Sequence, residues 1–130
     1  MDITESMRRL AALIASLSLL AFAGAATGAG GAPPQIPRIP GAWSHAEINV
    51  KIRRQSHTLI LDRGRVLQVT ASQLTLGEGA GGPTVIPVDG NTIVTLDGRR
   101  ASIIDLRRRM FATTLRVDGG DAVRVRAASF

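Results

Sequence analysis

The stretch FATTLRVDGGDAVRVRA, residues 111–127, decides the fold because apolar and polar side chains alternate through it on both sides of a glycine loop. Alternation with a period of two is typical of a β-strand that buries one of its faces. The stretch therefore predicts two antiparallel strands, 111–117 and 122–127. A three-residue loop at 119–121, with a glycine in a left-handed conformation, would join them.

The register of this hairpin decides which side chains face the core. Both apolar sets reach one interior only if Val117 faces Val123 and Arg116 faces Arg124. The side chains expected inside are Phe111, Thr113, Leu115, Val117, Val123, Val125 and Ala127. Three arginines are then expected together on the outer face: Arg116, Arg124 and Arg126.

The residues before the hairpin show the same pattern of short β-branched runs separated by Gly, Asp and Asn. We expect further strands at 46–53, 58–61, 65–70, 73–76, 84–88 and 92–96. The strands at 58–61 and 65–70 can form one long strand that bends at a bulge at Gly64. The predicted fold is all-β, a small five- to seven-stranded barrel or a rolled antiparallel sheet with one short helix.

A tight turn and the short helix are expected near residue 100. Asp97-Gly98 is a strong signal for a two-residue hairpin turn, because both of its positions need positive φ. Ser102 and Asp105 are placed to cap a helix of about two turns. The arginines expected at its carboxyl end, where exposed carbonyls favour cations, are Arg107, Arg108 and Arg109.

The first 26 residues have the layout of a secretory signal peptide. Arg8 and Arg9 precede a run without charge, and small residues suitable for cleavage follow. We therefore expect an exported protein, periplasmic or extracellular. The alternative is an uncleaved anchor at 10–32 with the domain outside the membrane. In both cases the arginine pair stays in the cytoplasm.

The sequence divides into the signal peptide at 1–26, a Gly/Ala/Pro linker at 27–41 and one domain at 42–130. The linker has no hydrophobic period, so we expect a spacer or a disordered tail. The domain has no cysteine, which excludes a disulfide, a thiolate metal site and a lipoprotein anchor. A domain of about 90 residues must therefore hold by apolar packing and backbone hydrogen bonds.

Several short segments of the domain resemble the sequences of a known protein family. They are 64–66 (GRV), 74–76 (LTL), 85–88 (VIPV), 94–102 (VTLDGRRAS) and 105–107 (DLR). Between about residues 59 and 127 the chain resembles a bacterial family of small secreted β-barrel domains of unknown function. The resemblance implies an export signal and a compact barrel similar to the oligonucleotide-binding type. The resemblance implies no activity and no functional residues. The chain departs from the family pattern at Arg108-Arg109, where family members often have Pro-Gly between the short helix and the next strand.

No catalytic constellation stands out in the sequence. Residues 77–82 match a dinucleotide-binding glycine pattern, yet a proline-containing strand follows where that motif needs a helix, so we expect a hairpin loop. His45 and His57, with Asp62 or Glu47, lack metal-ligand spacing, so we expect neither a metal site nor a cofactor. We therefore expect a protein that is not an enzyme.

The net charge of +6 is the feature that rises above background. All cationic residues except Lys51 are arginines, which suits bidentate binding of phosphate but is also what base composition can produce. The candidates for binding polyanions are Arg107, Arg108, Arg109, Arg116, Arg124 and Arg126. We expect a non-catalytic binding or structural module whose partner is an anionic envelope polymer or lipid, unless these arginines are simply a solvated face. Nucleic acid is the alternative partner, disfavoured by the scarcity of aromatic side chains.

Overall fold

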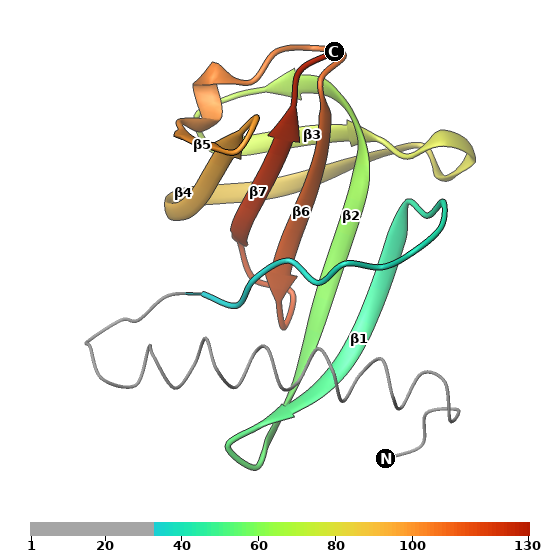
Figure 1. Ribbon diagram of the computed structural model, residues 1–130, viewed down its shortest axis with the longest axis vertical. Coiled ribbons are helices and arrows are strands. Elements are labelled where there is room, and N and C mark those ends of the chain that lie inside the picture. The colour runs from blue at the N-terminus through green and yellow to red at the C-terminus, as the bar shows by residue number, and fades with distance from the viewer. Residues whose placement is uncertain (1–32) are drawn as a thin grey trace.

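The computed structural model describes residues 33–130, which fold into seven strands and two single turns of 3₁₀ helix (Figure 1). The predicted signal peptide at 1–26 and the start of the linker lie outside the described residues. The elements are β1 (His45–Ile52), β2 (Gln55–Val69), β3 (Gln73–Gly77), η1 (Gly79–Gly81), β4 (Pro83–Leu96), β5 (Arg99–Ala101), η2 (Ile103–Asp105), β6 (Phe111–Val117) and β7 (Ala122–Ala128).

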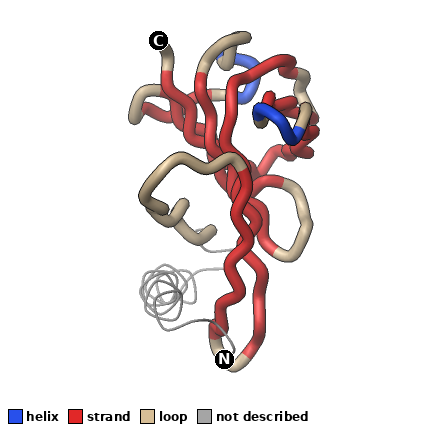
Figure 2. Tube along the Cα trace, turned by 90° about the vertical axis from the view of Figure 1, so that its right-hand side faces the viewer, coloured by secondary structure: helices blue, strands red, loops and turns tan. Residues whose placement is uncertain are grey.

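Five of the strands close into a barrel. Strand pairing runs β2-β3-β4-β7-β6, and β6 returns to pair with β2. All neighbours are antiparallel except β4 and β7, which are parallel. Two strands lie outside the closed set: β1 pairs with β2, and β5 pairs with the end of β4. The prediction of a small all-β barrel is therefore confirmed, and Figure 2 shows the β1–β2 hairpin extending beyond the end of the barrel.

The strand β2 is continuous, as the sequence suggested, but its irregularity is not at Gly64. The register with β3 shifts between Val66 and Gln68. Gly64 serves a different purpose, because a Cβ there would lie 2.3 Å from the carbonyl oxygen of Gly77. The missing side chain lets β2 approach β3 closely where the barrel curves.

The sheet buries apolar side chains on both of its faces. One cluster fills the barrel and comprises Val66, Leu74, Leu76, Ile86, Val88, Val94, Leu106, Ala112, Ala122, Val125 and Ala127. A second cluster lies against the outer face and comprises Val50, Ile52, Leu59, Leu61 and Leu115. Ile36, Ile39 and Trp43 pack against this second cluster from the segment that precedes β1.

The segment 33–44 is therefore part of the packed domain rather than only a spacer. Figure 1 shows it, in cyan, crossing β6 and β2. The Arg124 side chain donates hydrogen bonds to the carbonyl oxygens of Pro33 and Pro34, at 3.0 and 2.8 Å. Trp43 Nε1 donates to the carbonyl oxygen of Ile39 at 3.1 Å. These bonds hold the end of the predicted linker on the barrel wall.

The second cluster explains why the predicted register of the last hairpin is wrong. Leu115 pairs with Arg124 and Thr114 pairs with Val125, and the register then shifts around Val123. Val125 is inside as predicted. On β6, however, the interior side chains are Ala112 and Thr114, whereas Leu115 belongs to the outer cluster and Phe111 is 43% exposed. Alternation on a strand buried on both faces does not reveal which set faces the barrel.

The connection between β4 and β6 is close to the prediction but shorter in its helix. Asp97 and Gly98 both have positive φ and join β4 to β5, as expected. The helix is a single turn, because Leu106 adopts an extended conformation and is buried in the barrel. The Asp105 carboxylate accepts a hydrogen bond from the Ser102 backbone nitrogen at 2.8 Å.

The glycine-rich stretch 77–82 is the hairpin loop between β3 and β4, as expected. Across residues 33–130 no helix reaches the length and apolar character of a membrane span.

Candidate functional site

The six predicted arginines do not form one surface. Arg116 pairs with Ala122, a barrel-interior residue, so its side chain turns toward the inside of the barrel end. The guanidinium group of Arg124 is occupied by the two proline carbonyls, and burial, followed by the charge of Arg100, lowers its pKa. Arg126 is exposed on the wall.

The three arginines after η2 lie at the opposite end of β6 from Arg116. Arg107 donates to the carbonyl oxygens of Ile104 and Leu106, which matches the expected cation at a helix end. Arg108 and Arg109 are exposed. Only Arg126 among the predicted candidates is both exposed and part of the surface described next.

A row of alternating arginines and threonines crosses the outer wall at one level, and we call it the arginine row. Cross-strand partners share a face of the sheet. The row consists of Arg63 on β2, Thr113 on β6, Arg126 on β7, Thr95 on β4 and Arg100 on β5. The sequence could not reveal it, because its members are separated by up to 63 positions and meet only through the register of five strands.

Two shallow hollows open beside the arginine row. One of about 430 Å³ is lined by Pro37, Arg38, Ile39, Trp43, Arg63 and Arg126. The other, of about 110 Å³, is lined by Gln35, Ile36, Ile93, Thr95, Arg124, Val125 and Arg126. The segment 33–44 thus forms one wall of a surface whose other wall is the barrel.

Arg63 is fixed between two aromatic rings. Its guanidinium carbon lies 4.6 Å from the centre of the Trp43 ring and 5.6 Å from that of Phe111. Its Nε donates to the carbonyl oxygen of Trp43 at 3.1 Å. Phe111 is 43% exposed, which corrects the prediction that it faces the interior. Among residues 33–130, no carboxylate lies within salt-bridge distance of the arginines of the row.

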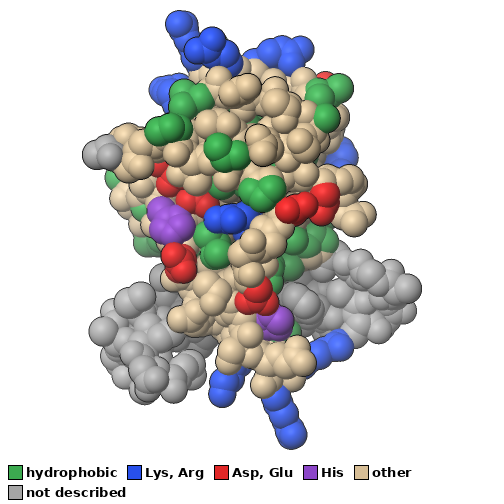
Figure 3. Space-filling view, turned by 180° about the vertical axis from the view of Figure 1, so that it is seen from behind, with side chains coloured by type: hydrophobic (Ala, Val, Ile, Leu, Met, Phe, Trp, Pro, Cys, Tyr) green, Lys and Arg blue, Asp and Glu red, His purple; other side chains and the backbone are tan. Residues whose placement is uncertain are grey.

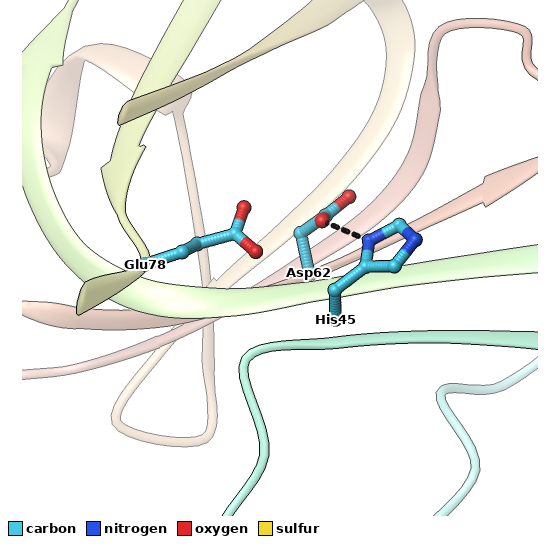
Figure 4. A group of neighbouring side chains, drawn as sticks. All are labelled: His45, Asp62 and Glu78. Carbon is cyan, nitrogen blue, oxygen red and sulfur yellow. Dashed lines mark hydrogen bonds and ion pairs between the residues drawn. The ribbon is translucent and has the colours of Figure 1, made fainter. Parts of the chain in front are cut away.

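A second polar group lies where β1, β2 and the β3–β4 loop meet, and we call it the acid–histidine cluster (Figure 4). It consists of His45 on β1, Asp62 on β2 and Glu78 directly after β3. His45 Nδ1 lies 2.6 Å from Asp62 Oδ1, and His45 Nε2 lies 3.0 Å from Glu47 Oε2. Figure 3 shows acidic side chains and histidine across the middle of one face, with lysine and arginine projecting at both ends.

The surroundings of His45 and Glu78 in the acid–histidine cluster favour the protonated form of each side chain. The hydrogen bond with Asp62, followed by that with Glu47, raises the pKa of His45. Burial raises the pKa of Glu78, the charge of Asp62 adds to the rise, and a hydrogen bond with Thr84 opposes it. Arg116 is the nearby cation, with one guanidinium nitrogen 3.9 Å from Asp62 Oδ2.

The structure separates the two histidines that the sequence analysis considered together. His57 Nδ1 contacts Asp118 Oδ2 at 2.7 Å. A backbone hydrogen bond from Thr58, followed by the one with His57, lowers the pKa of Asp118. His45 instead meets Asp62 and Glu47, as considered, together with Glu78, which the sequence analysis missed. Residue spacing could not have found Glu78, because it reaches the cluster only when β2 and β3 pair.

No family model, curated protein or solved structure matches this chain. Nothing in these comparisons points to catalysis.

Proposed function

We propose that this protein is an exported, non-catalytic binding module that holds an anionic envelope polymer on its arginine row. Export is supported by the sequence of the first 26 residues. Binding of an anion is supported by the net charge of +6 and by the arrangement of Arg63, Arg126 and Arg100 across the wall.

The observation that carries the proposal is the spacing of the row. Neighbouring arginines are two strands apart, which is about 9 to 10 Å. Guanidinium groups donate to phosphate in a bidentate geometry, and a threonine hydroxyl at Thr95 adds a neutral donor beside them. A linear polymer with repeated phosphates can therefore contact several arginines at once as it crosses the strands.

Single-stranded nucleic acid is the second candidate, and one observation favours it. Phe111 and Trp43 flank Arg63, and Phe111 is 43% exposed, so a stacking surface exists beside the cations. The barrel order, with its parallel pairing of β4 and β7, is also that expected of an oligonucleotide-binding-like barrel.

Titrations with purified wall teichoic acid and with a single-stranded oligonucleotide, each at low and high salt, test the proposal. The variant pair Arg100→Gln and Arg126→Gln should weaken polymer binding about tenfold and reduce the salt slope by about two. Arg108→Gln with Arg109→Gln is the matched control, since it removes the same charge away from the row.

Equal losses in the two double variants, or binding that does not respond to salt, would overturn the use of the arginine row. Tighter binding of the oligonucleotide, lost on Phe111→Ala, would select the second candidate.

The location of the protein has its own test. Because small residues suitable for cleavage follow the apolar run, we expect the mature chain to begin shortly after residue 26. Mass spectrometry of the protein recovered from cells measures this. A mass that retains residues 10–32 in the membrane fraction would favour the anchored form.

A further inference from the structure

The acid–histidine cluster lies where three separate elements converge. His45 belongs to the outer strand β1, Asp62 to β2, and Glu78 to the loop after β3. Figure 4 shows the three side chains turned toward one another. Asp62 is 1% exposed and Glu78 is 8% exposed. Both acidic residues are thus more than nine-tenths buried.

Glu78 hydrogen-bonds to Thr84 and Asp62, yet one oxygen of each buried carboxyl group lacks a hydrogen-bond partner among residues 33–130. Asp62 Oδ2 and Glu78 Oε2 make no hydrogen bond. Arg116 approaches Asp62 Oδ2 only to 3.9 Å, and its own buried Nε is also without a hydrogen-bond partner. Buried carboxylates in proteins are paired, hydrogen-bonded or bound to a metal ion, because an isolated buried charge is costly. The unsatisfied oxygens point to a ligand that completes them.

We propose that His45, Asp62 and Glu78 bind one divalent transition-metal ion of the zinc class. One ligand atom from each residue lies within 4.8 Å of the others. Metal bonds of about 2.0 to 2.1 Å place any two ligand atoms at most about 4.2 Å apart. Rotation of the half-exposed His45 side chain and the Glu78 side chain can close this difference. An imidazole with two carboxylates is a donor set that suits zinc better than magnesium or calcium.

Glu47 orients the histidine for this role. Both ring nitrogens face carboxylate oxygens, Nε2 towards Glu47 at 3.0 Å and Nδ1 towards Asp62 at 2.6 Å, so the ion would displace the Nδ1 proton while Glu47 goes on accepting from Nε2. A carboxylate on the second ring nitrogen is the usual partner of a metal-binding histidine. The His45 side chain is 46% exposed, so the ion has access from solvent and water can complete its coordination.

The charges also fit a divalent ion. Asp62 and Glu78 together neutralise it, and Arg116 then becomes a nearby repelling charge. Removal of Arg116 should therefore tighten metal binding, whereas loss of a ligand should weaken it. Because the ligands come from β1, β2 and the β3–β4 loop, the ion would tie the outer strand to the barrel.

Calorimetric titration of the purified, chelator-stripped protein with zinc chloride tests the proposal. One equivalent should bind, and the melting temperature should rise by several degrees with zinc. His45→Gln and Glu78→Gln should each weaken binding at least tenfold. His57→Gln is the matched control, because His57 forms a similar contact with Asp118 at 2.7 Å but belongs to no group of three ligating side chains among residues 33–130.

Arg116→Gln provides a second test if a ligand variant folds poorly, because it removes a repelling charge and leaves the three ligands in place. Severalfold tighter zinc binding in this variant supports the site. The proposal is overturned if the wild-type protein binds no zinc, if His57→Gln weakens binding as much as His45→Gln, or if Arg116→Gln weakens it like a ligand variant.

Discussion

At the scale of single residues, Gly64 is the described glycine at which an added side chain would make the shortest contact. Alanine there would bring a Cβ to 2.3 Å from the Gly77 carbonyl oxygen, so β2 and β3 would have to separate. We expect Gly64→Ala to lower the free energy of unfolding by about 3 kcal/mol. Urea denaturation measures this. Gly90→Ala in β4, where nothing lies within 4 Å, should change it by less than about 0.5 kcal/mol. Equal effects would show that the close approach is not limiting.

The raised pKa of His45 predicts how stability depends on pH. The folded protein holds this proton more tightly than the unfolded chain, whose value is 6.5. The resulting stabilisation is complete below pH 6.5 and is lost as the pH rises through the folded pKa. The raised pKa of Glu78 acts in the same direction from 4.5 upward.

Urea midpoints of the chelator-treated protein between pH 5 and 9 would measure this effect. The midpoint should fall with rising pH and should fall less in His45→Gln. A slope that His45→Gln leaves intact would contradict the assignment to His45 and its partners Asp62 and Glu47.

Most of the candidate residues could not be placed from the sequence for the same physical reason. A strand fixes only whether neighbours share a face, and the register between strands fixes which residues meet. Arg126 was found because its own strand alternates clearly. Arg63 and Glu78 gave no local signal, since one meets Arg126 only across β6 and the other meets Asp62 only across the β2–β3 pairing.

At the scale of elements, the segment 33–44 helps to cover the second hydrophobic cluster, which lies outside the barrel. It covers the outer wall together with β1, and Arg124 holds its start. We expect Arg124→Gln to cost about 1 to 2 kcal/mol of stability, because two charged, partly buried hydrogen bonds to backbone carbonyls are lost. The single tryptophan, Trp43, reports on the segment, so its fluorescence should shift to the red.

Arg100→Gln is the control for this experiment, since Arg100 is exposed and does not contact the segment's carbonyls. An identical fluorescence shift in the two variants would contradict the holding role of Arg124.

The elements themselves were largely predictable, and the errors have one origin. Short β-branched runs and the Asp97-Gly98 turn located the strands because these signals are local. The phase of β6 was wrong, because Ala112 and Leu115 are both buried, each in a different cluster. The helix was too long in the prediction, since capping signals do not show that Leu106 leaves the helix to reach the barrel.

At the scale of the whole molecule, we expect local stability against unfolding to be highest in the closed barrel and lower in the outer strand β1. β6 has a partner strand on each side, whereas β1 pairs with β2 alone. We expect amides of β6 and β7 to exchange with solvent slowest and those of β1 to exchange faster by at least tenfold. Hydrogen exchange followed by NMR measures this. Amides of β1 as protected as those of β6 would mean that the two clusters unfold as one unit.

The position of β7 in the barrel has a consequence for biosynthesis. It is the last of the seven described strands to be synthesised, yet it lies between β4 and β6 and supplies the parallel pairing with β4. Until it emerges, β4 and β6 each lack the partner strand that lies between them, and the ring is open. Closure of the ring therefore depends on the carboxyl-terminal strand of the described domain, because β7 must reach the β4 edge and the β6 edge together.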